Sequence, residues 1–290
     1  MPDASLILAF VMMVALTLYA LMGGADYGGG VWDLLATGER KAAQREVIAN
    51  AIAPIWEANH VWLILVIVIL FSAFPPAFAA LSTSLHIPLT LLLLGIIARG
   101  SAFTFRKYDS SKDAVQARWG RIFSVSSTIT PLLLGIIVGA LSLGKISEKI
   151  EGLTFQQVYI DSWLNPFCLS VGGFALVLFS FLAAVYLTFV ANTDELKSDF
   201  RFRAICAQFA CATLALLVFF LADREVPDLH EALTHSPWSI GLQIITAICA
   251  LTSTIGLLTR HYPIARIFAA SQVTLILWGW GLSHFPYLIR

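Results

Sequence analysis

The sequence has 290 residues, of which 58% are hydrophobic and 12% charged, and its formal net charge is zero. A soluble domain is nearer half apolar and a quarter charged, so the composition excludes a soluble globular domain and indicates a membrane protein with several spans. The balanced charge gives no indication of a nucleic-acid partner. The four cysteines lie in apolar runs without a C-x-x-C pattern, so neither a disulfide framework nor a zinc site is predicted.

Crossing the hydrocarbon core takes about 20 mostly apolar residues. The first such window lacks a basic n-region and a small-residue cleavage site, so we expect a transmembrane helix there rather than a signal peptide. Phe74-Pro75-Pro76 predicts a tight hairpin between the second and third windows, because proline ends one helix and opens the next. The sequence therefore predicts an all-α, polytopic protein. Its eight expected transmembrane helices lie at about residues 5–24, 53–74, 77–98, 122–143, 163–190, 204–222, 238–259 and 264–283.

Lysine and arginine alternate between the two sides of this predicted arrangement. The loops after the first, third, fifth and seventh helices hold 14 of the 18 basic residues, and the opposite side holds 4. Arg99 is counted in the loop after the third helix. The positive-inside rule places those loops in the cytoplasm and the N-terminus outside. The loop around residues 223–231 is acidic, and no connection is long enough for a soluble domain.

One acid, Asp26, lies at the end of the first window within GGADYGGG. A charged side chain is costly in lipid, so such a residue usually faces a bundle interior or water. The glycines allow the helix to unwind or another backbone to approach, and an ordinary helix terminus at the interface is the alternative. Gly24 and Gly28, and likewise Gly135 and Gly139, are spaced for close helix contacts.

A second acid, Glu57, lies in ANAIAPIWEANHVWL between Trp56 and Trp62, just before an apolar run. With Pro54 in the first turn of a helix, Glu57 and His60 share one face. Such a pair is able to relay a proton, to bind a metal or to act as a self-satisfied helix cap. Di-iron bundles repeat E-x-x-H with further glutamates, and no second copy occurs here, so no metal site is predicted.

His86 is expected inside the third helix. A lone histidine there is weak support for a haem ligand. Neither G-x-S-x-G nor H-E-x-x-H occurs in the sequence. The residues alone therefore indicate a membrane subunit with one or two intramembrane acids and no self-contained active site.

Four stretches together resemble subunit II of the cytochrome bd quinol oxidases. They are GGADYGGGVWDLL, ANAIAPIWEANHVWLILVIVILFSAFPPAFA, LNPFCLSVGG and WGWGLSHFPYLI, and the N-terminal part carries most of the likeness. The resemblance implies a subunit of a quinol oxidase of the respiratory chain in the bacterial cytoplasmic (inner) membrane. It also implies two four-helix bundles, which we expect at residues 1–150 and 151–290.

In that family, subunit II pairs with subunit I, which carries a low-spin haem b, a high-spin haem b and haem d, and which oxidises quinol from the quinone pool. Whether haem d or a further haem b occupies the oxygen site is open here. The resemblance implies that this chain binds no haem or metal, stabilises subunit I and brings cytoplasmic protons, and in some members dioxygen, towards the haems. Some members hold a structural quinone in subunit II, and that too is open.

The resemblance places the family's acidic position on Glu57, its asparagine on Asn59 and its tryptophans on Trp56 and Trp62. It places the aspartate of the first helix on Asp26. Glu57, His60 and Asp26 are thus the expected proton path, with the two tryptophans shielding it from lipid. Some members carry a further acid at the position of Gly23, so any role of that acid is lost or moved here.

The sequence ends at Arg290, before the ninth helix of the family, either because it is truncated or because this member lacks that helix. Two other functions stay open. One is a stand-alone secondary transporter or ion channel that uses Asp26 and Glu57 beside a glycine-interrupted helix. The other is a purely structural scaffold for a haem-bearing partner.

Overall fold

The computed structural model describes residues 4–108, 113–146, 152 and 154–289, without the side chains of residues 56, 57, 106–108, 113 and 114. All regular structure in this part of the chain is helical, as the composition predicts. The helices are α1 Ala4–Leu34, α2 Lys41–Ile52, α3 Trp56–Ala73, α4 Pro75–Ser84, α5 His86–Tyr108, α6 Asp113–Ser142, α7 Phe155–Tyr159, α8 Pro166–Val190, α9 Asp194–Glu225, α10 Pro227–His235, α11 Ser239–Leu258 and α12 Tyr262–His284.

Six described helices are long and apolar enough to cross a membrane: α1, α5, α6, α8, α9 and α11. The pair α3 and α4 passes the same test only if its two parts are taken together as one bent span. Helix α12, with 23 residues, is not among the six. Side chains such as Ile64, Leu216 and Leu251 point outwards and are more than half exposed, which is the arrangement that lipid as a solvent requires.

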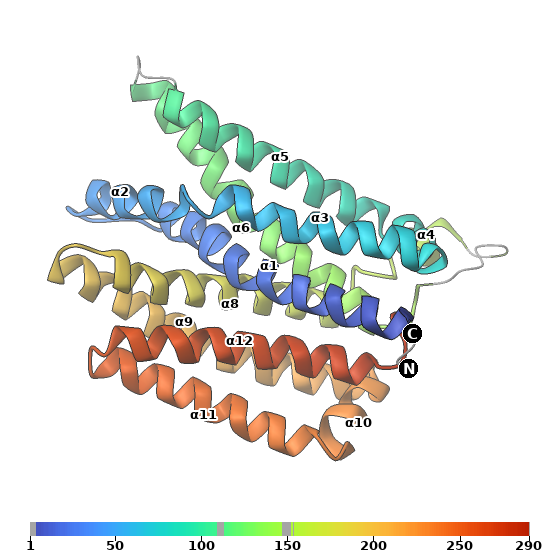
Figure 1. Ribbon diagram of the computed structural model, residues 1–290. Helices are drawn as coiled ribbons and strands as arrows, with labels where there is room; N and C mark the ends of the chain where they lie inside the picture. Colours follow the sequence, from blue (N-terminus) through green and yellow to red (C-terminus); the bar gives the residue numbers. More distant parts are fainter. Residues whose placement is uncertain (1–3, 109–112, 147–151, 153, 290) are drawn as a thin grey trace.

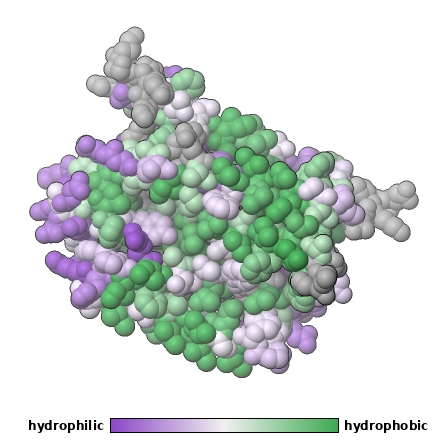
Figure 2. Space-filling model, in the orientation of Figure 1, coloured by the Kyte–Doolittle hydropathy of each residue, from purple (hydrophilic) through white to green (hydrophobic). Residues whose placement is uncertain are grey.

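The long helices run roughly side by side, with both termini at one end of the molecule (Figure 1). Helix α2 and the α8–α9 and α11–α12 connections lie at the opposite end. Hydrophilic residues gather at that opposite end, and hydrophobic residues cover much of the middle of the visible face (Figure 2). This agrees with the grouping of basic residues after odd-numbered spans.

The tight hairpin expected at Phe74-Pro75-Pro76 is wrong. Phe74 does end α3 and Pro75 does begin the next helix, but that helix is the short α4, which is bent by 115° relative to α3. The third long helix then begins at His86, not near residue 77. His86 is consequently the exposed first residue of α5, with its ring against Tyr159 of α7, and does not lie in the interior of that helix.

Other connections are more helical than expected. Helix α1 continues ten residues beyond the predicted end of the first span, and the basic stretch after it forms α2. Helix α9 runs to Glu225, and α10 takes up most of the expected acidic loop. Helix α3 begins at Trp56, so Pro54 lies in the preceding turn and not in the first turn of the helix.

Helix α8 forms the centre of the fold and packs against α1, α6, α9 and α12. Both predicted glycine pairs face it. A Cβ on Gly28 would overlap the carbonyl oxygen of Phe179, and a Cβ on Gly135 would lie 2.6 Å from that of Val171. Gly24 and Gly139 likewise face α8. The prediction that these glycines allow close helix contacts is therefore confirmed, and it explains how α1 is drawn into the middle of the molecule.

Candidate functional site

Asp26 lies inside a continuous helix and is completely buried. The expectation that the glycines around it end or unwind the first helix is wrong, because α1 runs on for another eight residues. In a membrane the backbone must satisfy its own hydrogen bonds, which favours continuation of the helix through small residues. The glycines instead hold α1 against its neighbours: Gly28 faces α8, and Gly30 faces Ser127 of α6. The Asp26 carboxylate is thereby enclosed in the interior of the helix bundle.

The partner of Asp26 is Arg99, a residue that the sequence assigns to a cytoplasmic loop. That assignment is wrong, because Arg99 lies in the middle of α5 and only 1% of its surface is exposed. Its Nη2 donates a hydrogen bond to Oδ1 of Asp26, and the two side chains form an ion pair. Its Nε donates to the Ser127 hydroxyl of α6 at 3.0 Å. The first-half helices α1, α5 and α6 are thus joined by one buried cation.

Aromatic rings enclose the guanidinium of Arg99. Its central carbon lies 4.8 Å from the ring centre of Tyr27 and 5.1 Å from that of Phe123. The Tyr27 hydroxyl lies 3.3 Å from that of Tyr19, one further buried polar contact on α1. Cation–π contacts stabilise a desolvated guanidinium by about 2 kcal/mol. These rings therefore offset part of the cost of burying the charge.

Helix α3 supplies Asn59, the asparagine of the sequence motif. Its Nδ2 lies 3.4 Å from Oδ2 of Asp26 and donates to it, and the side chain is fully buried. A Cβ on Gly23 would lie 3.3 Å from this nitrogen, so the small residue leaves room for the amide. The neighbouring His60 is partly buried and close enough to interact electrostatically with the Asp26 carboxylate. Two of the expected proton-path residues, Asp26 and His60, are thus brought together.

The side chains of Glu57 and Trp56 lie outside those that the structure describes, so the expected relay through Glu57 and the shielding by Trp56 stay predictions. Trp62 is partly buried and packs beside Tyr19, Tyr27 and Phe179. That position lies next to the polar cluster of Asp26, Arg99, Asn59 and Ser127, which we call the Asp26 cluster.

A second buried acid, Asp33, escaped the sequence reasoning. It lies seven residues after Asp26 in the same helix, which is two turns and about 10 Å along one face. The hydroxyl of Ser124 donates to Oδ2 of Asp33 at 2.6 Å, and Nε of Arg45 lies 3.7 Å from Oδ1. The heptad spacing from Asp26 is the feature of the sequence that could have revealed it. Asp33 stands between the Asp26 cluster and the end of the molecule that carries α2.

At that end, polar groups that range from exposed to buried connect the two halves of the chain. Arg40 makes two hydrogen bonds to Asp199 of α9, at 2.8 and 2.6 Å. Gln44 donates to the same carboxylate and accepts a hydrogen bond from Arg203. The hydrogen bonds to Asp199 raise the pKa of the Arg40 guanidinium, so it stays charged at any physiological pH. This cluster fixes the connection between α1 and α2 against α9.

Among the described residues, no three histidine, cysteine or acidic side chains are grouped so that they could hold a metal ion. The charged groups inside the helix bundle are the Asp26 carboxylate and the Arg99 guanidinium, which form an ion pair. The Asp33 carboxylate lies nearer the end of the molecule that carries α2.

Comparison with known proteins identifies the family to which the chain belongs. A family model described as "Cytochrome bd terminal oxidase subunit II" matches residues 4–290. The chain belongs to this family. The resemblance drawn from the sequence motifs is therefore confirmed, and the match spans every residue of the Asp26 cluster.

Two curated relatives and one solved structure agree with the family assignment. The "Cytochrome bd-I ubiquinol oxidase subunit 2" of Escherichia coli is 31% identical over 93% of this chain and 78% of the relative. The "Cytochrome bd ubiquinol oxidase subunit 2" of Bacillus subtilis is 30% identical over 87% and 71%. The bd oxidase structure from Geobacillus thermodenitrificans matches the fold with a TM-score of 0.82, at 19% identity, over 99% of this chain and 86% of that chain.

Membership of the cytochrome bd subunit II family, with the membrane-spanning helices, makes this chain an integral membrane protein. The relatives are named as second subunits of quinol oxidases, so the family belongs to an oxidoreductase complex with at least one other subunit. Among the described residues, the fully buried acidic and basic side chains are Asp26, Asp33 and Arg99, and two of these three belong to the Asp26 cluster.

Proposed function

We propose that this chain is the non-haem-binding subunit II of a cytochrome bd-type quinol:dioxygen oxidoreductase in the bacterial inner membrane. It forms a heterodimer with a haem-bearing subunit I, which carries haem b and haem d or b and receives electrons from quinol. In this proposal the chain crosses the membrane eight times, in two four-helix bundles at residues 1–150 and 151–290, with the N-terminus outside. The family match and the relatives' names support it.

We further propose that the chain carries cytoplasmic protons into the complex by way of Glu57, His60 and Asp26. The observation that supports this is the buried Asp26 cluster. Asp33 lies about 10 Å nearer the basic end of the molecule, so a proton moving from the cytoplasm would meet it first. Water between the two carboxylates would complete the path. Arg99 would favour the ionised form of Asp26 between proton transfers, so that the carboxylate is ready to accept the next proton.

A secondary transporter or channel is less well supported. That alternative depends on a helix interrupted beside the acid, and α1 is continuous through Gly23, Gly24 and Gly28–Gly30. The bend that does occur, between α3 and α4, lies at the other end of α3 from Asn59 and the Asp26 cluster.

Glu57→Gln should slow quinol oxidase turnover of the assembled complex about tenfold or more, while haem content stays at the wild-type level. Gln has the same shape but is unable to exchange a proton, and general acid–base steps contribute factors of about 100 or more. The measurement is oxygen consumption together with the haem absorption spectrum of the purified complex. Glu46→Gln, on the exposed face of α2, is the matched control and should leave turnover unchanged. Wild-type turnover in a fully loaded Glu57→Gln complex would remove Glu57 from the path.

Asp33→Asn should lower turnover by a smaller factor, roughly threefold to tenfold, because its carboxylate lies on the outer part of the proposed path. Ser124 and Arg45 keep hydrogen-bonding partners in the variant, since the amide oxygen and the backbone carbonyl of residue 33 remain. Rates would be measured from pH 6 to 8, with proton uptake followed in vesicles. A pH profile identical to that of the wild type would show that protons do not pass Asp33.

A further inference from the structure

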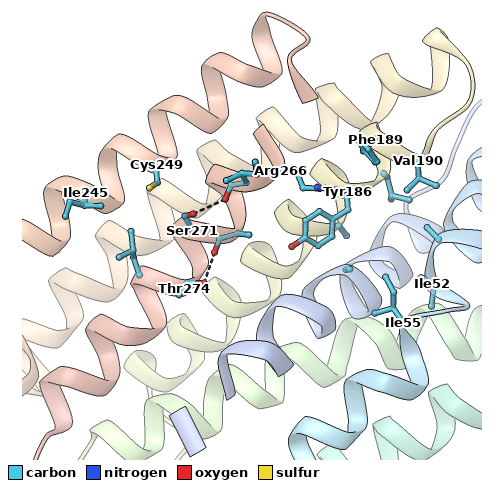
Figure 3. Close-up of a pocket in the computed structure, with 17 residues that line it drawn as sticks. Ile52, Ile55, Tyr186, Phe189, Val190, Ile245, Cys249, Arg266, Ser271 and Thr274 are labelled. Atoms are coloured by element: carbon cyan, nitrogen blue, oxygen red, sulfur yellow. Dashed lines mark hydrogen bonds between the residues drawn. The ribbon is translucent and has the colours of Figure 1, made fainter. Parts of the chain in front are cut away.

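A groove with a volume of about 880 Å³ opens between α12, α11, α8 and the α1–α2 region (Figure 3). Its size lies within the range of about 300–1,000 Å³ that small-molecule sites occupy. In Figure 3, the ring of Tyr186 from α8 lies between Ile52 and Ile55 on one side and the side chains of α12 on the other. The groove is otherwise lined mainly by aliphatic side chains, among them Leu187, Ile245, Ile267 and Leu275.

The long dimension of the groove matches one leaflet of a membrane. Along α12 its lining runs from Arg266 to Leu275, which are about 14 Å apart along the helix axis. Half of the hydrocarbon core of a bilayer is about 15 Å. Arg266 is only four residues from the beginning of α12, at the end of the molecule that carries α2. The cation therefore sits at headgroup depth, and the aliphatic part extends towards the middle of the bilayer.

The groove contains one cation and no acid. Arg266 is exposed, and its guanidinium carbon lies 4.4 Å above the ring centre of Phe189, which directs it towards α8. None of the lining residues is aspartate or glutamate, and no ion pair of Arg266 occurs among the described side chains. The Ser271 and Thr274 hydroxyls donate to carbonyls of their own helix, at 3.0 and 2.9 Å. Arg266 is thus the charged group of the groove for which the described side chains supply no counter-charge.

We propose that this groove binds one anionic phospholipid, with its phosphodiester on the Arg266 guanidinium and an acyl chain along α12 and α8. A guanidinium binds phosphate through two parallel hydrogen bonds, which makes this pairing both strong and directional. A neutral amphiphile such as a quinone would fill the aliphatic part and leave the cation unpaired. An apolar helix of a partner subunit would desolvate the same charge without compensation. The phospholipid is the occupant that satisfies both parts of the groove.

The test uses the oxidase complex purified through a tag on this chain and placed in nanodiscs that hold equal amounts of phosphatidylglycerol and phosphatidylcholine. Native mass spectrometry of the released complex then counts the retained lipids. The wild type should retain one phosphatidylglycerol in preference to phosphatidylcholine. Arg266→Gln should reduce that preference about tenfold, as expected for the loss of a hydrogen bond to a charged group. Arg118→Gln, an exposed arginine of α6, is the matched control and should behave as the wild type.

A second variant, Ala270→Phe, fills the aliphatic part of the groove and leaves Arg266 in place. It should also lose the retained phosphatidylglycerol, which keeps the proposal testable if Arg266→Gln fails to assemble. Wild-type retention in Ala270→Phe would overturn the proposed place of the acyl chain. Equal loss in Arg118→Gln, equal retention of both lipids, or a retained quinone that is insensitive to Arg266→Gln would overturn the proposal of a specific anionic lipid.

Discussion

Replacing Arg99 with methionine should destabilise the protein by about 3–5 kcal/mol and sharply lower the amount of assembled oxidase. Methionine replaces the aliphatic part of the arginine side chain but leaves the Asp26 carboxylate fully buried without its cation. Removing one partner of a buried ion pair costs about that much, because the remaining charge is desolvated and uncompensated. The hydrogen bond to Ser127 is lost as well. The measurement is the thermal or chaotrope-induced unfolding of the purified complex in detergent, together with its yield.

The double variant Asp26→Asn with Arg99→Met tests whether the uncompensated charge of Asp26 causes this loss of stability. It removes both charges, so most of the lost stability should return, although the turnover of the complex should stay low. The coupling between the two positions in this double-mutant cycle should be at least about 2 kcal/mol. Arg118→Met, on the exposed face of α6, should change stability little. A single Arg99→Met variant as stable as the wild type would mean that the buried pair does not hold α1 and α5 together.

Gly28→Ala should destabilise the protein by about 3 kcal/mol or more, which is large for the addition of one methyl group. The new Cβ would overlap the backbone carbonyl of Phe179 and would lie 2.7 Å from the Cβ of Ala183, so α1 and α8 have to separate. Backbone is unable to yield as a flexible side chain does, and overpacking of this kind costs about 1–3 kcal/mol even where side chains move. Unfolding of the complex in detergent and the haem content of the preparation are the measurements.

Gly241→Ala is the matched control for this experiment. Gly241 is also a helical glycine, near the beginning of α11, but a Cβ there would meet no atom within 4 Å. The substitution should be neutral or stabilising by up to about 1 kcal/mol, because alanine loses less backbone entropy than glycine. If the two variants had equal effects, the cost at position 28 would come from glycine replacement in general and not from the contact between α1 and α8.

The membrane class and the family motifs could be read from the sequence because each depends on local composition or on residue order. Asp26 could be identified for a similar reason. Placing an acid in lipid costs free energy whatever the tertiary structure, so an acid next to an apolar window is noticeable in the sequence alone. Asn59 was identified by its motif, and it does contact Asp26.

Arg99 was assigned to the wrong place and Asp33 was overlooked, for two different physical reasons. The 115° bend after α3 moves the start of α5 to His86, so a helix counted from residue 77 ends before Arg99. For Asp33, the run of glycines suggested a helix end, since glycine in water favours the unfolded chain. Here the glycines instead allow contacts with α8 and α6, and those contacts stabilise the helix through them.

The sequence by itself determined that this is a helical membrane protein of the cytochrome bd subunit II family with an acid, Asp26, at the edge of its first predicted span. Only the tertiary structure decided that the acid is paired, and with which cation, because Asp26 and Arg99 are 73 residues apart and lie in helices that meet only after packing. Composition and hydropathy depend on neighbours in the chain, and the compensation of a buried charge depends on neighbours in space.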